Sequence, residues 1–266
     1  MRWWESIQSW WRSRAVPEAR GEGAPANPRV IVKRDWKTLE LRFKAGTAQS
    51  RMSRWAPDRL MVDYTRTMLG ALLLVPRPAT VGMVGLGGGS QAKFLHRHLR
   101  DARLLVFEND PGVLALRGHF RIPKDDARLE VRLADAAREL SAHREAFDLL
   151  LVDGYDVDGI PEALSTQRFY ADCRASLRVG GAMAVNLYDT AHAEHLHRIR
   201  IAFGASNVHV VDEPRQSNRV AFAWVPPLAV AETPALAHEG LLELRHVFAG
   251  LCGGPFEARR AARDEF

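Results

Sequence analysis

The feature that most constrains the fold is an alternation of short apolar runs with amphipathic stretches across residues 80–203. The apolar runs predict strands, and in chain order they are TVGMVGL, RLLVFE, LEVRLA, FDLLLVD and GAMAVNL. The stretches between and after them predict helices at 91–99, 111–120, 136–143, 165–177 and 191–203. Strands without a polar face, separated by helices, are typical of a parallel sheet that is covered on both sides. With two closing strands, NVHVVDE and NRVAFAWV, the sequence predicts an α/β fold with a doubly wound, seven-stranded sheet.

The segments outside this alternation predict smaller units. Short alternating runs within RVIVKR, TLELRFKAG and TAQSRM indicate an antiparallel β unit. Pro57 and Asp58 are typical of a helix start, and the apolar spacing after them predicts a helix that reaches Val75. We therefore expect four parts: a Trp-rich N-terminal segment with a linker at 1–28, the small β unit at 29–56, the sheet domain at 57–228, and a helical tail at 229–266.

Composition excludes several classes of protein. A chain of 266 residues with 47% apolar side chains can form one sizeable core. Its two cysteines, Cys173 and Cys252, form neither a disulfide framework nor a metal-binding CxxC pair, which indicates a reducing, cytoplasmic setting without a metal site. The net charge of +5 is spread along the chain, so dedicated nucleic-acid binding is not expected. No run approaches the roughly 20 apolar residues of a membrane span.

The first 14 residues, MRWWESIQSWWRSR, form a basic and Trp-rich stretch. On a helix, Trp3, Ile7, Trp10 and Trp11 share one face, and arginines surround it. Three interpretations stay open: a helix that docks on its own domain or on a second subunit, a helix that lies on an anionic membrane surface, and a disordered segment. Peripheral membrane contact through residues 1–14 is therefore one expectation among three.

A glycine-rich turn, VGLGGGS, follows the first strand of the predicted sheet. Its Gly85, Gly87 and Gly89 allow a ligand to approach the backbone closely at the N-terminus of the next helix. Glu108 ends the second strand, 23 residues after Gly85, where an acidic side chain can hold both hydroxyls of a ribose. This arrangement favours a nucleoside site.

Two further strands also end in carboxylates. Asp135 ends the third strand beside Ala136, where it can accept a hydrogen bond from an adenine amino group, although aspartate is also a common helix N-cap. Asp153 ends the fourth strand. Because ligands of open α/β sheets bind beyond the carboxyl ends of the strands, we expect these carboxylates to face one crevice.

Several segments together resemble the spermidine synthase (polyamine aminopropyltransferase) family over about residues 30–225: VGLGGGSQAKFLHRH, LLVFENDPGVLAL, EVRLADAAREL and FDLLLVDGYDVDGIPEALSTQRFYADCRASLRVGGAMAVNL. The most specific element is the D-x-x-D pair of Asp153 and Asp156. The resemblance implies a Rossmann-like sheet of the class I methyltransferase type. It also implies decarboxylated S-adenosylmethionine as co-substrate, a small-molecule amine acceptor and a homodimer.

The resemblance also implies roles for individual residues. Glu108 would bind the ribose of the donor and Asp135 its adenine, while Asp153 would help to hold the amine and Asp156 would take its proton. The remaining residues are expected to line the site: Gln49, Gly85, Gly87, Gly89 and Ala136 on the donor side, and Tyr64, Arg66 and Tyr155 on the substrate side.

The two aspartates also make chemical sense without the resemblance. An alkylamine has a pKa of about 10.4, so at neutral pH it arrives as an ammonium ion that cannot attack carbon. A pair of carboxylates can first attract this cation and then accept its proton. A sulfonium carbon is already activated, so positioning and deprotonation make up most of the catalytic work.

The sequence departs from the family pattern in the glycine turn and near the amine site. Gly88 stands where the family has an aspartate, and Thr65 and Arg66 match a tyrosine-histidine pair, with Tyr64 next to them. A fixed anion in the turn favours the decarboxylated donor and repels the carboxylate of ordinary S-adenosylmethionine, so the donor is left open. A Gly88→Asp variant is expected to shift the preference towards the decarboxylated donor.

Three hypotheses about function follow. The first is aminopropyl transfer to an amine with Asp156 as general base. The second is methyl transfer from S-adenosylmethionine on the same fold. The third is a non-catalytic nucleoside-binding or interaction protein in which the Trp-rich segment is the working part.

Overall fold

The computed structural model of the chain describes residues 30–43, 48–156, 158–188, 192–213, 218–228, 232–251 and 255–256. The Trp-rich stretch 1–14 and the linker after it therefore lie outside the described residues. Among the helices within these ranges, none is long and apolar enough to cross a membrane.

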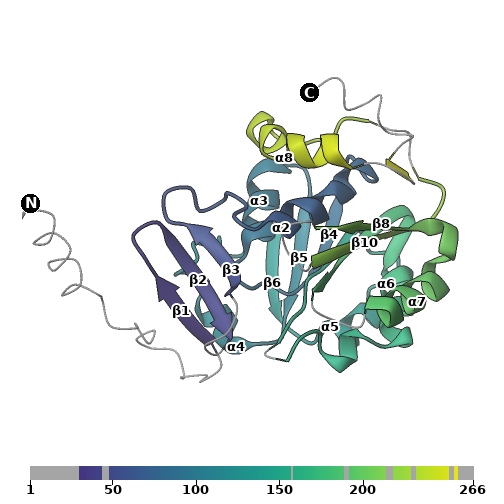
Figure 1. Ribbon diagram of the computed structural model, residues 1–266, viewed down its shortest axis with the longest axis horizontal. Helices are drawn as coiled ribbons and strands as arrows, with labels where there is room; N and C mark the ends of the chain where they lie inside the picture. The colour runs from purple at the N-terminus through teal and green to yellow at the C-terminus, as the bar shows by residue number, and fades with distance from the viewer. Residues whose placement is uncertain are drawn as a thin grey trace, which may run out of the picture.

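A seven-stranded sheet forms the centre of the molecule (Figure 1). Its strand order is β6-β5-β4-β7-β8-β10-β9, and β10 runs antiparallel to both of its neighbours, while the other pairings are parallel. This confirms the predicted sheet. The strands are β4 (Thr80–Val84), β5 (Arg103–Glu108), β6 (Leu129–Leu133), β7 (Phe147–Val152), β8 (Leu177–Tyr188), β9 (Val208–Asp212) and β10 (Asn218–Trp224).

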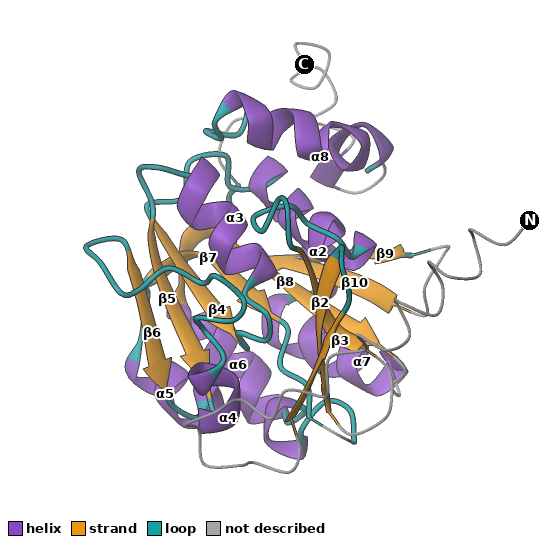
Figure 2. Ribbon diagram, turned by 90° about the vertical axis from the view of Figure 1, so that its left-hand side faces the viewer, coloured by secondary structure: helices purple, strands orange, loops and turns teal. Residues whose placement is uncertain are grey.

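Helices cover both faces of this sheet (Figure 2). Successive residues of β7 show why: Leu149 and Leu151 belong to one apolar cluster, whereas Leu150 and Val152 belong to a second cluster on the opposite face. A strand buried on both sides has no polar face, as the sequence predicts. The helices are α2 (Asp63–Met68), α3 (Ser90–His98), α4 (Pro111–Ala115), α5 (Ala136–Glu139), α6 (Gln167–Ser176), α7 (His192–Phe203) and α8 (His238–Gly250), with short 3-10 turns at Leu69–Leu73, Leu140–Ala142, Glu162–Leu164 and Ala205–Asn207.

The helix expected from Pro57 begins six residues later, at Asp63, which corrects that boundary. The reason lies in tertiary contacts that the residues before Asp63 make with other elements. The backbone N–H of Leu60 donates to the carboxylate of Glu243 on α8 at 2.7 Å, and the carboxylate of Asp58 binds Arg97 at 2.8 Å. Backbone and side-chain groups that a helix start would use are therefore committed to other elements.

The small N-terminal unit is an antiparallel sheet of β1 (Val30–Arg34), β2 (Thr38–Phe43) and β3 (Ala48–Ser53), as predicted. It lies next to the glycine turn after β4, because the Ser50 hydroxyl accepts a hydrogen bond from the N–H of Gly88 at 3.0 Å. The β unit thereby closes one side of the crevice at the carboxyl ends of the strands.

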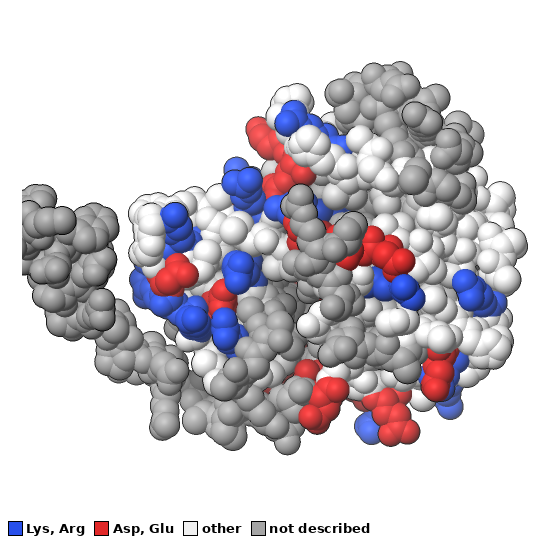
Figure 3. All heavy atoms as spheres, viewed as in Figure 1, with Lys and Arg blue, Asp and Glu red and all other residues white. Residues whose placement is uncertain are grey.

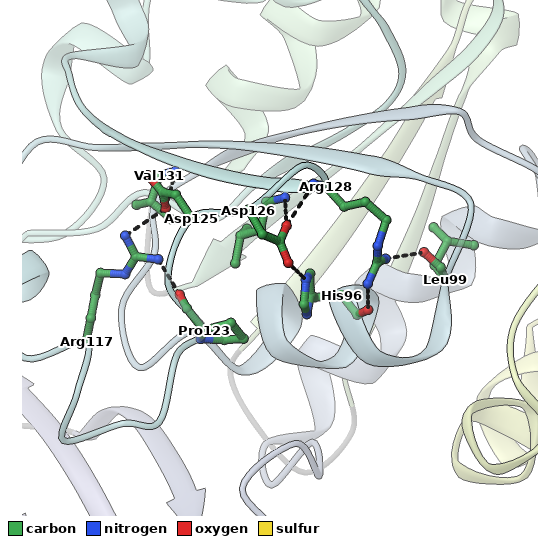
Figure 4. Close-up of polar contacts among 9 residues, drawn as sticks. His96, Leu99, Arg117, Pro123, Asp125, Asp126, Arg128 and Val131 are labelled. Atoms are coloured by element: carbon green, nitrogen blue, oxygen red, sulfur yellow. Dashed lines mark hydrogen bonds and ion pairs between the residues drawn. The ribbon is translucent and has the colours of Figure 1, made fainter.

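The loop before β6 is tied to the end of α3 (Figure 4). Asp126 accepts hydrogen bonds from the backbone N–H groups of Arg128 and Leu129, at 2.7 and 2.8 Å, and lies 2.8 Å from Nε2 of His96. The Arg128 guanidinium donates to the carbonyl of His96 at 2.9 Å, which satisfies an acceptor at the C-terminus of α3. These contacts fix α3, whose N-terminus carries the glycine turn.

Candidate active site

One cleft opens at the carboxyl ends of β4, β5, β6 and β7. Glu108, Asp135, Asp153 and Asp156, the four carboxylates singled out in the sequence, all line it. The cleft holds about 1050 Å³ of empty space, a volume that includes space open to solvent. The β unit contributes Leu41 and Phe43 to the opposite wall.

The glycine turn needs its glycines for different reasons. Gly85 has φ +90°, and a Cβ there would lie 2.3 Å from the carbonyl oxygen of Asp153, so only glycine allows β4 and β7 to approach so closely. Gly87 (φ +51°) also lines the cleft. Gly89 (φ +65°) instead faces Ile122 and does not line it. Gly85 and Gly87 are therefore placed to meet a ligand, and Gly89 shapes the turn.

Glu108 is a buried carboxylate at the floor of the cleft, with 7% of its surface exposed. Its two oxygens accept hydrogen bonds from the N–H groups of Leu86 and Asp110, each at 2.9 Å. Burial raises the pKa of Glu108, and the backbone hydrogen bonds oppose this shift. Asp110 caps α4 by accepting from Gly112 at 2.7 Å, so Glu108 is not the cap of that helix.

Asp135 caps a helix and also lines the cleft. Its side chain caps α5 by accepting a hydrogen bond from the N–H of Ala137 at 3.0 Å. The same side chain lines the cleft beside Ala136. The capping oxygen is Oδ1, and Oδ2 lies 3.5 Å from Nε of Arg138, so a ligand would share this second oxygen with an exposed arginine.

Asp153 belongs to a chain of polar side chains beneath the cleft. Its carboxylate accepts hydrogen bonds from the Tyr64 hydroxyl at 3.0 Å and from the Asn186 amide at 2.9 Å. The oxygen of that amide in turn accepts from Asn218 at 2.8 Å. Burial raises the pKa of Asp153, and the bonds from Asn186 and Tyr64 oppose the rise. The position and rotation of this carboxylate are thus fixed from two sides.

Asn186 and Asn218 are functional candidates that the sequence reasoning missed. Both are buried polar residues: Asn186 lies within the apolar run AVNLY of β8, and Asn218 is the first residue of β10. A buried amide is costly unless it is hydrogen-bonded, so an asparagine within such a run is the signal that could have identified Asn186.

Two tyrosines stand beside Asp153. The Tyr155 hydroxyl accepts from the N–H of Tyr188 at 2.6 Å and donates to the carbonyl of Asn186 at 2.9 Å, so it braces the loop after β7. Burial, assisted by the negative charge of Asp153, raises the pKa of the Tyr64 hydroxyl. Both tyrosines are therefore neutral hydrogen-bonding groups that line the cleft.

Asp156 lies at the exposed lip of the cleft, on the loop after β7. Its N–H donates to the carbonyl of Gly159 at 2.9 Å, and its Oδ1 accepts from the N–H of Asp158 at 2.8 Å. These two bonds define a turn that presents the carboxylate to the cleft, three residues from Asp153.

The structure places Arg66 away from the residues that line the cleft. Its guanidinium donates to Asp63 at 2.8 Å and to the carbonyl of Leu60, and the residue does not line the cleft. The neighbouring Thr65 does line it, as does Gln91, a buried residue that was not predicted and that donates to the carbonyl of Thr65 at 3.2 Å. Gln49 belongs to β3, but its side chain lies outside the described residues.

An aspartate at position 88 requires the side chain of Ser50 or Phe120 to shift. A Cβ at Gly88 would lie 2.9 Å from Cβ of Ser50 and 3.0 Å from the ring of Phe120, and Gly88 does not line the cleft. That Gly88→Asp shifts donor preference stays a prediction, and the substitution also requires the neighbours of position 88 to move.

We expect Gly88→Ala to lower the free energy of unfolding by about 1–3 kcal/mol, since the added methyl group overpacks a filled site. Chemical denaturation measures this change. The matched control is Gly118→Ala, where a Cβ meets nothing within 4 Å and the stability should change by less than about 0.5 kcal/mol. Adding Ser50→Gly should restore part of the loss. Equal stability of the Gly88 and Gly118 variants would show that this packing is wrong.

The described residues contain no group of three or more His, Cys, Asp or Glu side chains that could hold a metal ion. The polar groups of the cleft are instead carboxylates, tyrosine hydroxyls, amides and backbone N–H groups. Such groups bind hydroxyls and amines directly.

Solved structures share this fold. A probable spermidine synthase from Corynebacterium glutamicum matches 85% of this chain and 85% of its own, with a TM-score of 0.63 and 16% identity. Human methyltransferase-like protein 13, solved in complex with SAH, matches 76% of this chain and 93% of its own, with a TM-score of 0.57 and 21% identity. The sheet is therefore of the class I methyltransferase type, as predicted.

Sequence comparison identifies the family. No family model matches the chain. The polyamine aminopropyltransferase of Chromobacterium violaceum is 32% identical over 181 residues, which cover 67% of this chain and 69% of that protein. The match confirms the resemblance seen in the glycine turn and the D-x-x-D pair. The chain belongs to the polyamine aminopropyltransferase family.

Proposed function

We propose that this protein transfers an aminopropyl group from decarboxylated S-adenosylmethionine to a small-molecule amine. The observation that carries the proposal is the convergence of four carboxylates on one cleft, from the ends of β5, β6 and β7 and from the loop after β7. In the reaction the amine nitrogen attacks the methylene carbon next to the sulfonium. The carbon–sulfur bond breaks, methylthioadenosine leaves, and the nitrogen gives up a proton.

The donor half of the site is formed by the turn after β4 and the ends of β5 and β6. Glu108 binds the ribose hydroxyls, and Asp135 accepts from the adenine amino group. Gly85 and Gly87 let the donor lie against the backbone, with Ala136 beside the base. This assignment is supported by the position of Glu108, whose carboxylate is already oriented by two backbone N–H groups.

The acceptor half lies around Asp153. Its carboxylate attracts the ammonium form of the amine, and the hydrogen bonds from Tyr64 and Asn186 keep it in one orientation. Asp156, at the open side, takes the proton that must leave before or during attack. Tyr155 completes the wall between the two aspartates.

Methyl transfer from ordinary S-adenosylmethionine is the second candidate. It is favoured by the absence of a carboxylate at Gly88, because no anion in the turn repels the carboxylate of that donor. The fold similarity to methyltransferase-like protein 13 agrees with it. The family relationship supports the aminopropyl reaction more strongly.

One experiment separates the candidates. The protein is incubated with each donor and a panel of diamines and polyamines, and the nucleoside product is identified. We expect methylthioadenosine from the decarboxylated donor in an amine-dependent reaction. S-Adenosylhomocysteine from the ordinary donor would favour methyl transfer instead. Failure to bind either donor or methylthioadenosine would support a non-catalytic protein.

The remaining expectations concern the setting of the enzyme. We propose a cytoplasmic homodimer, which the family resemblance supports. Peripheral membrane contact through residues 1–14 stays a proposal, because those residues lie outside the described ranges.

A further inference from the structure

Two tryptophans protrude from one end of the small N-terminal sheet. Trp36, in the turn between β1 and β2, is 64% exposed, and Trp55, just after β3, is 78% exposed. The register places both at the same end, since Thr38 pairs with Ser53. We call Trp36, Lys37, Arg54 and Trp55 the aromatic tip. Large apolar side chains exposed together mark interaction sites more often than single ones do.

The aromatic tip is held in place by its own hydrogen bonds. The N–H of Arg54 donates to the carbonyl of Lys37 at 2.9 Å, and its guanidinium donates to the carbonyls of Asp35 and Trp36 at 2.9 and 3.3 Å. Nζ of Lys37 lies 4.3 Å from the centroid of the Trp36 ring. Because the turn is already ordered, little conformational freedom remains to be lost on binding.

The small sheet has an excess of positive charge, and Arg34, Lys37 and Arg54 lie at its tip end together with Asp35. The stretch 30–56 has seven Lys and Arg residues and two carboxylates, against a net charge of +5 for the whole chain. Both carboxylates are engaged: Glu40 pairs with Arg42 and Arg51, and Asp35 accepts from the N–H of Lys37 within the turn. Figure 3 shows Lys and Arg side chains gathered over β1–β3 at the left of the molecule.

We propose that the aromatic tip docks on an anionic lipid surface. An indole ring is apolar with one N–H donor, and it is favoured at the boundary between acyl chains and headgroups. Lysine and arginine next to it are attracted by acidic headgroups. The rings protrude from a turn instead of lining a groove, which suits a flat surface better than a nucleic-acid strand.

Such docking leaves the cleft accessible. The tip is at the Thr38 end of β2, whereas Leu41 and Phe43, which line the cleft, are towards its other end. The proposal does not depend on the reaction catalysed, so it stands or fails separately from the proposed function.

Sedimentation of the full chain with vesicles tests the proposal. We expect binding to vesicles that contain phosphatidylserine, little binding to pure phosphatidylcholine, and loss of binding at high salt. The double variant Trp36→Ala/Trp55→Ala should bind at least about tenfold more weakly, and Lys37→Glu should weaken binding too. The control Ile201→Ala removes an apolar side chain of 59% exposure on α7 and should bind like the wild type.

Three results would overturn the proposal. The first is no binding of the wild type to anionic vesicles. The second is equal binding by the wild type and the double tryptophan variant, which would place the contact elsewhere in the chain. The third is tip-dependent binding of a single-stranded oligonucleotide without vesicle binding, which would assign the surface to nucleic acid.

Discussion

Replacing Asp156 with asparagine is expected to slow amine-dependent release of methylthioadenosine by about 10²- to 10⁴-fold, the range that a general base contributes. The substitution keeps the size of the side chain and its hydrogen bond from the N–H of Asp158, so the turn should stay intact. Binding of methylthioadenosine should not change, because the proposed nucleoside contacts come from Glu108 and Asp135. Single-turnover kinetics with saturating donor measure the effect.

The dependence on pH distinguishes a base from a merely structural residue. Without Asp156 the reaction needs amine that is already deprotonated, and below the amine pKa of about 10.4 this fraction rises tenfold per pH unit. The rate of Asp156→Asn should therefore climb with pH more steeply than that of the wild type. The control is Asp158→Asn, an exposed neighbour in the same turn, which should retain the wild-type rate within a few-fold. Equal losses in the two variants would rule out a special role for Asp156.

The sheet could be predicted from the sequence because the spacing of apolar residues indicates which positions are buried. The run LLLV of β7 is apolar on both faces, and Leu149, Leu150, Leu151 and Val152 are all buried. The location of Glu108, Asp135 and Asp153 at one edge followed from the same reasoning, since the carboxyl ends of parallel strands meet there. For these three residues, a position at the end of a predicted strand was enough to predict that they lie at this edge of the sheet.

Side-chain partners were not predictable in this way. Asn186 and Asn218 meet because β10 pairs antiparallel with β8, a register that no local pattern encodes. Arg66 binds Asp63 and the Leu60 carbonyl instead of facing the cleft, because the residues before Asp63 form a turn. This turn is held by a hydrogen bond from the backbone N–H of Leu60 to Glu243 of α8, which is 183 residues away in the sequence. Long-range contacts therefore decided which side chains enter the site.

The second large effect is expected at Glu108, where Glu108→Gln should raise the KM for the donor. Hydrogen bonds to a charged group contribute about 1.5–3 kcal/mol each, so losing two ribose contacts corresponds to about 10²- to 10⁴-fold in affinity. The carboxylate of Glu108 accepts hydrogen bonds from the backbone N–H groups of both Leu86 and Asp110. A glutamine side chain has only one oxygen, so its NH₂ group would face one of these two N–H groups. The variant thus loses the orientation of its side chain as well as its charge.

Comparing the KM for the donor with the KM for the amine shows which of the two substrates Glu108 binds. Because methylthioadenosine keeps the ribose, its affinity should fall in parallel with the donor KM, while the KM for the amine stays unchanged. Glu130→Gln is the matched control: its carboxylate is on the neighbouring strand β6, is exposed and pairs with Arg132, so donor binding should stay at the wild-type value. Thermal melting of both variants shows that they are folded. A rise in the amine KM with the donor KM unchanged would move Glu108 from the nucleoside half of the cleft to the acceptor half, and the assignment of both halves would have to be exchanged.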